Sequence, residues 1–92
     1  MTEFQIGKIV GVPCEISSGA FSEEKFITLE SDQEIITGFV NDRLLFNIEG
    51  KRGYVCGIVQ EINTPTIDVW IEGSFFNTSG LAKFDIDWAN YN

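Results

Sequence analysis

Hydrophobic and polar side chains alternate along much of this chain, in short runs that are separated by turn residues. The clearest run covers residues 66–72, where every second side chain is aliphatic, namely Ile67, Val69 and Ile71. Successive side chains of a β-strand point to opposite faces, so this pattern predicts a strand with one buried face. No segment keeps the apolar period of ~3.6 residues that marks an amphipathic helix. The sequence therefore predicts an all-β fold.

The runs and turns predict about six short, mainly antiparallel strands. The candidate runs are residues 4–10, 14–16, 26–29, 34–40, 44–48, 54–62 and 66–72. Pro13 separates the first two runs, and we expect a bulge, a bend or an edge position there, because proline has no N–H to give to a sheet. Residues 49–53 carry the strongest hairpin signal. At most one or two helical turns are expected near the C-terminus, at residues 87–90.

Strands of this length and spacing favour a small closed barrel, of the SH3-like or OB-like kind. Closure into a barrel would also remove exposed strand edges, which are an aggregation hazard in so apolar a chain. A small β-sandwich is the alternative architecture. The length of 92 residues suits one domain, and we expect a single β domain over residues 1–92.

The chain carries 14 acidic and 6 basic residues, which gives a formal net charge of −8. Nucleic-acid binding is driven mainly by Lys and Arg on phosphates, and anionic membranes attract basic surfaces, so neither partner is expected. An acidic surface favours a protein partner with a basic surface. Residues 1–4 include an acid where a signal peptide carries Lys or Arg, and no apolar run approaches the ~20 residues of a membrane helix. A cytoplasmic location is therefore expected.

Most catalytic and metal-binding arrangements lack a required residue in this sequence. There is no histidine, which excludes His-activated nucleophiles, a His general base and His-ligated metals. Cys14 and Cys56 are too few for a zinc site and too far apart for a redox motif, and their apolar settings predict buried, reduced thiols. No glycine-rich phosphate loop is present. We therefore predict no catalytic residue, no metal and no cofactor.

One pair of carboxylates keeps an enzymatic alternative open. Asp85 and Asp87 flank a single residue, so in a strand they would share one face. Such a pair can hold a hard cation or divide acid and base roles. The simpler interpretation is a solvated strand end with Ile86 directed inward.

The first candidate binding residue is a tryptophan beside two acids. If the aliphatic residues of the run 66–72 face the core, Trp70 lies on the opposite face, between Asp68 and Glu72. An exposed indole between carboxylates suits a Lys or Arg side chain, because the ring face attracts the cation and the carboxylates pair with it. The alternative is that the C-terminal tail covers Trp70.

The second candidate is the adjacent pair Phe75 and Phe76, in the loop-like, glycine-bounded segment 73–80. Two neighbouring side chains of an extended backbone cannot both face one core. We expect one ring to close the end of the barrel and the other to be a contact residue at the surface. The alternative is that both rings plug the mouth of the barrel.

These features favour a non-catalytic protein-binding module, such as an inhibitor, an immunity-type factor or an assembly subunit. Its acidic surface would bind a basic partner, with these candidate contacts: Trp70, Asp68, Glu72, Phe75 and Phe76. One alternative is a single-strand nucleic-acid binder on an OB-like barrel, which would stack bases on aromatic rings but would lack a positive groove. The other alternative is a small carboxylate-based enzyme, which would need a concave pocket beside Asp85 and Asp87.

Overall fold

The computed structural model describes residues 5–19, 21–31, 34–76, 78–86 and 90–91, and this part of the chain is all-β. Its strands, in chain order, are β1 (Ile9–Ser18), β2 (Glu24–Glu30), β3 (Ile35–Asn41), β4 (Leu45–Glu49), β5 (Arg52–Asn63), β6 (Thr66–Trp70), β7 (Ser74–Phe75), β8 (Leu81–Asp85) and β9 (Asn90–Tyr91). A three-residue 3-10 turn, Asp42–Leu44, joins β3 to β4. Every pairing is antiparallel, which confirms the predicted fold class.

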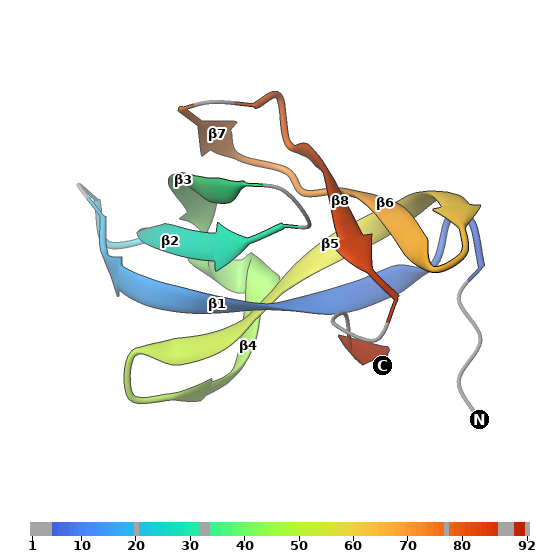
Figure 1. The fold of residues 1–92 in the computed structure, drawn as a ribbon. Helices are drawn as coiled ribbons and strands as arrows, with labels where there is room; N and C mark the ends of the chain where they lie inside the picture. Colours follow the sequence, from blue (N-terminus) through green and yellow to red (C-terminus); the bar gives the residue numbers. More distant parts are fainter. Residues whose placement is uncertain (1–4, 20, 32–33, 77, 87–89, 92) are drawn as a thin grey trace.

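The strands form one sheet in the order β7-β3-β2-β1-β5-β6-β8. β5 is the longest strand, and one of its edges pairs with β1 through residues 52–58. Its other edge pairs with β4 near the beginning of β5 and with β6 near its end. β1 likewise pairs with β9 near its beginning and with β2 near its end, on the edge away from β5. β1 and β5 are therefore the centre of the sheet (Figure 1).

The sheet curls on itself into a half-barrel, in agreement with the predicted small barrel (Figure 1). Two irregularities accompany the curl. The pairing of β5 with β6 shifts between Val59 and Glu61, and that of β4 with β5 shifts between Phe46 and Glu49. Bulges of this kind bend a strand and increase its twist, which a flat ladder would not provide.

Pro13 lies inside β1, which runs through it without interruption. On the edge of β1 away from β5, β9 pairs with residues 10–11 and β2 pairs from residue 15 onward. Among the described residues, positions 12–14 therefore have no strand partner on that edge. A residue without an N–H is tolerated at such a position, which explains why the two expected runs form one strand.

The inner face of the curled sheet holds the hydrophobic core. In β6 the predicted alternation is realised, since Ile67 and Val69 are fully buried and Ile71 just beyond is 1% exposed. The other fully buried side chains come from β1, β2, β3, β5 and β8, and they are Val10, Val12, Ile27, Val40, Val55, Val59 and Phe84. Among the described residues no polar or charged side chain is buried. The core is thus entirely apolar, and all polar chemistry lies at the surface.

Two segments differ in detail from the sequence expectation. The segment 73–80 was expected to be loop, and it contains the two-residue strand β7, which pairs with Gly38 and Phe39 of β3. The helical turns expected at residues 87–90 fall mostly on positions outside the described residues, and Asn90 belongs to β9. In the part of the chain that the structure describes, no helix is long and apolar enough to cross a membrane.

Candidate protein-binding surfaces

Trp70 lies at the end of β6, on the face of the sheet opposite the core. Its two chain neighbours are buried, whereas its own side chain is 37% exposed. Its direct cross-strand partners are Ile58 on β5 and Leu81 on β8, and both are exposed hydrophobic residues. Directly opposed residues point to the same face of an antiparallel pair, so Trp70 sits between two aliphatic side chains.

Asp68 already has a cation of this chain beside it. Nζ of Lys83 donates to Oδ1 of Asp68 at 2.9 Å, and the two residues are cross-strand partners on β6 and β8. On the other side of β6, Glu61 of β5 is the residue opposite Asp68. A ligand cation at Trp70 would therefore have to compete with Lys83 for this carboxylate.

Glu72 and Phe76 lie in a different place, at the end of the sheet where β3 meets β7. Phe76 is 68% exposed, and its ring centroid lies 6.1 Å from that of Phe26 and 6.0 Å from that of Phe39. The centroids of Phe26 and Phe39 are 5.3 Å apart. We call these three residues the phenylalanine cluster. Phe75 points the other way and is packed against the core, so of the adjacent pair one ring is inward and the other outward.

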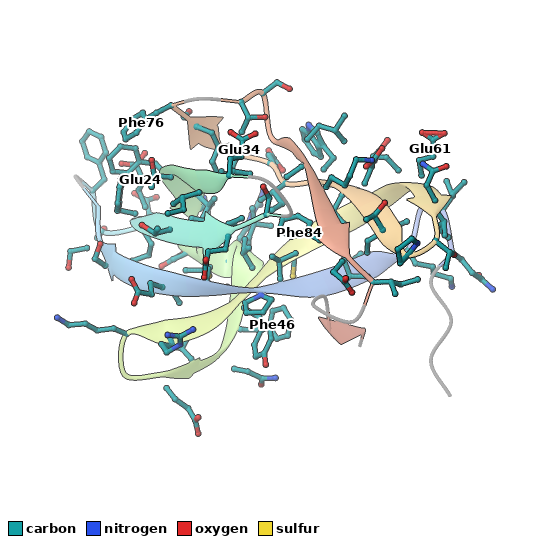
Figure 2. All side chains as sticks on the ribbon, in the orientation of Figure 1. Glu24, Glu34, Phe46, Glu61, Phe76 and Phe84 are labelled. Atoms are coloured by element: carbon teal, nitrogen blue, oxygen red, sulfur yellow. The ribbon has the colours of Figure 1, made fainter. Side chains whose placement is uncertain are left out.

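A pocket of about 310 Å³ adjoins the phenylalanine cluster. Phe39 belongs to both, and the other apolar side chains that line the pocket are Phe21, Val40 and Leu44. Its polar lining includes Asn41 at the end of β3 and Ser74 of β7, and its carboxylates are Glu23, Glu24 and Glu72. We call this the acidic pocket. Figure 2 shows Glu24 and Phe76 at the same end of the molecule.

The carboxylates of the acidic pocket lack a basic partner among the described residues. Neither of the two ion pairs formed among the described residues involves Glu23, Glu24 or Glu72. The adjacent Lys25 donates from Nζ to the backbone oxygen of Ser22, at 3.1 Å. The pocket therefore combines an apolar wall with carboxylates that form no ion pair among the described residues.

Both cysteines are free thiols, as predicted, but only Cys14 is buried. Burial raises the pKa of the Cys14 thiol to about 11, although the charge of Arg52 opposes the shift. Cys56 is half-buried because alternation directs it to the outer face of β5, and partial burial raises the pKa of its thiol too. Neither thiol is activated as a nucleophile, since activation requires a lowered pKa.

Other chemistry finds little support in the geometry. Asp85 is an exposed residue at the end of β8, and Asp87 lies outside the described residues. Among the described positions, no group of three or more Cys, Asp or Glu side chains is placed to hold a metal ion.

Sequence reasoning missed the residues that connect Glu72 to Phe76. Glu23 and Glu24 carry no pattern that distinguishes them from a solvated turn. Phe26 and Phe39 carry a usable signal: each directly precedes a buried aliphatic residue, Ile27 or Val40, so the rule that places Trp70 on the outer face also applies to them. The exposed cross-strand partners of Trp70 can be identified only from the strand register, which local patterns in the sequence do not reveal.

Comparison of the chain with protein-family models, with curated protein sequences and with solved structures found no match.

Proposed function

We propose that this chain is a non-catalytic protein-binding module, and that its acidic pocket takes a Lys or Arg side chain from a basic partner. The observation that carries the proposal is the lining of the pocket. Three carboxylates without a basic partner among the described residues surround a cavity whose other walls include two phenylalanine rings, Phe21 and Phe39.

Lysine and arginine have the two properties that such a lining selects. Their long aliphatic stems pack on apolar surface while the charged head stays among polar groups. The stem would lie against Phe21 and Phe39, and the head would face Glu23, Glu24 and Glu72. The ring faces add a cation–π attraction of about 0.5–1 kcal/mol at an exposed site.

The phenylalanine cluster extends the same surface with an apolar contact. Phe76 is 68% exposed at the edge of the phenylalanine cluster. Exposed aromatic residues are common anchors of protein interfaces. A partner that places an apolar residue next to its basic residue would engage both parts of the surface.

The charge of the molecule supports a basic protein over a nucleic acid. A phosphate at the acidic pocket would meet carboxylates, and the chain has only 6 basic residues against 14 acidic ones. The free thiols fit the reducing conditions of the cytoplasm, which is the location we propose.

The test uses two charge-matched variants and a labelled oligolysine peptide as the probe. The first variant, Glu23→Gln/Glu72→Gln, removes two carboxylates of the acidic pocket. The second, Glu30→Gln/Glu49→Gln, removes two exposed carboxylates that do not line the pocket and leaves the same net charge. Binding is measured by fluorescence anisotropy at physiological salt.

We expect the first variant to bind oligolysine about tenfold more weakly than the wild type, since hydrogen bonds to charged groups contribute about 1.5–3 kcal/mol. We expect the second to change binding by about twofold or less, because exposed charges beyond the Debye length of about 8 Å are screened. Equal losses in the two variants would mean that only net charge matters and would refute the pocket. Absence of binding by the wild type would refute the proposed function itself.

A further inference from the structure

Four exposed hydrophobic side chains form a row across four neighbouring strands. The register places Ile9 of β1 opposite Ile58 of β5, Ile58 opposite Trp70 of β6, and Trp70 opposite Leu81 of β8. All four point to the outer face, with exposed fractions of 56%, 37%, 37% and 48% in that order. We call them the outer apolar row. The row shares no residue with the acidic pocket.

The outer apolar row is uncharged, although the molecule carries a net charge of −8. The next pair of outward positions along β1 and β5 is Gly11 and Cys56, which are also uncharged. On the opposite side the row is bordered by Glu61, Asp68 and Lys83. Lys83 pairs with Asp68 at 2.9 Å, and neither ion pair of the described residues involves Glu61.

The spacing of the row distinguishes between kinds of occupant. Neighbouring strands lie about 4.8 Å apart, and one turn of an α-helix advances about 5.4 Å. A helix laid along the row would place one side chain per turn on each strand, with a mismatch of about 2 Å over the four contacts. Same-face side chains of an extended peptide are about 6.7 Å apart, and the mismatch would reach about 6 Å.

The charges around the row also distinguish between possible partners. A second copy of this chain would bring its own Glu61 and its own net charge of −8, so like charges would meet around the contact. An anionic membrane would be repelled in the same way. A helix with basic residues along one flank would instead place opposite charge against Glu61.

We propose that the outer apolar row binds an amphipathic α-helix of a partner protein, with apolar residues once per turn and Lys or Arg along the flank that faces Glu61. Trp70 and Ile58 are the central contacts, since the middle of an interface is the most completely desolvated part of it. This surface is separate from the acidic pocket, so the proposal goes beyond the proposed function and does not rest on it.

The test uses three labelled peptides of about 18 residues, designed for this purpose. The first has Leu at positions i, i+4, i+7 and i+11 with Lys on the flank. The second replaces these Lys residues with Glu, and the third keeps the composition of the first but places Leu at every second position. Affinities are measured by anisotropy for the wild type, Ile58→Ser, Leu81→Ser, and the control Ile35→Ser. Ile35 is 60% exposed and lies on β3, outside the row.

We expect the first peptide to bind the wild type most tightly, and Ile58→Ser to weaken it about tenfold, the usual consequence of removing a central contact. Leu81→Ser, at the end of the row, should weaken it less, by about fivefold. Ile35→Ser should change its affinity by about twofold or less. Glu23→Gln/Glu72→Gln is measured alongside to detect binding of the peptide at the acidic pocket. Thermal midpoints of the variants verify that they fold, and the two row variants lie on different strands, so one informative variant remains if the other is unstable.

Four results would overturn the proposal. Equal binding of the Lys and Glu peptides would show that charge does not select the partner. Equal binding of the third peptide would show that the occupant need not be a helix. Loss of binding in Glu23→Gln/Glu72→Gln, but not in Ile58→Ser, would assign the peptide to the acidic pocket. A dimer of the wild type in sedimentation velocity that Ile58→Ser abolishes would make a second copy the occupant.

Discussion

The ring of Phe46 lies over the backbone of Gly11, although their strands, β4 and β1, do not pair with each other. The ring also stacks on Tyr54, with centroids 5.6 Å apart and planes 25° from parallel. Gly11 is buried and has no positive φ, so its backbone does not require glycine. What requires glycine is the ring, because a Cβ at position 11 would overlap Cζ of Phe46.

This contact predicts that Gly11→Ala destabilises the wild type by about 1–3 kcal/mol, the usual cost of overpacking. In a Phe46→Ala background the same change should be neutral or stabilising by up to about 1 kcal/mol, because alanine restricts the unfolded chain. The measurement is a double-mutant cycle by urea unfolding. Additive effects in the cycle would show that the ring does not restrict position 11.

Trp70→Ala should destabilise the protein by about 0.4–2 kcal/mol. The indole loses two cross-strand neighbours, Ile58 and Leu81, and each aromatic–aliphatic pair of this kind contributes about 0.2–1 kcal/mol. Chemical denaturation followed by far-ultraviolet circular dichroism measures the effect. A loss above about 4 kcal/mol, as for a core truncation, would mean that Trp70 is structural and would remove it from the binding surface.

Phe76→Ala and Phe39→Ala should separate binding from stability. Phe76 is exposed, so its truncation should cost about 1 kcal/mol, the lower end of what two aromatic contacts contribute. Phe39 belongs to β3, to the phenylalanine cluster and to the wall of the acidic pocket, so its truncation should lower both stability and oligolysine affinity. Unfolding midpoints and anisotropy are compared on the same samples. A larger stability loss in Phe76→Ala than in Phe39→Ala would contradict this arrangement.

The thiol of Cys14 predicts a loss of stability at alkaline pH. Its pKa is raised by burial from its ordinary value of 9.0 to about 11, so the folded state retains a proton that the unfolded state has already released. The stabilisation from this proton is complete below pH 9 and is lost as the pH rises toward 11. Unfolding free energies measured from pH 8 upward should therefore fall more steeply in the wild type than in Cys14→Val. Identical slopes would mean that this thiol is not the source.

Local alternation was sufficient to predict what depends on one strand. It placed Ile67, Val69 and Ile71 in the core and Trp70 on the outer face, and the structure agrees. The same rule could have placed Phe26 outside as well. It works because the two faces of a strand are fixed by backbone geometry, whatever the strand pairs with.

The acidic pocket could not be predicted in this way, because its parts are distant in the chain. Glu23 precedes β2, whereas Glu72 follows β6, and they line one pocket only because β7 pairs with β3. The pairing of Asp68 with Lys83 is another case, since it depends on the register of β6 and β8. Such contacts are set by the tertiary arrangement and carry no local signal in the sequence.

The position of β5 has a consequence for how the chain folds while it is being synthesised. β1, β2 and β3 leave the ribosome first, and they can pair with one another as a three-stranded meander. Their buried face, which includes Val10, Val12 and Ile27, cannot pack against β6 and β8 until β5 emerges, because among the described residues only β5 connects this meander to those strands. For that interval the nascent chain exposes apolar surface and an unpaired edge of β1, the features that chaperones recognise. Synthesis through Asn63 is thus the step that first allows the two halves of the sheet to be joined.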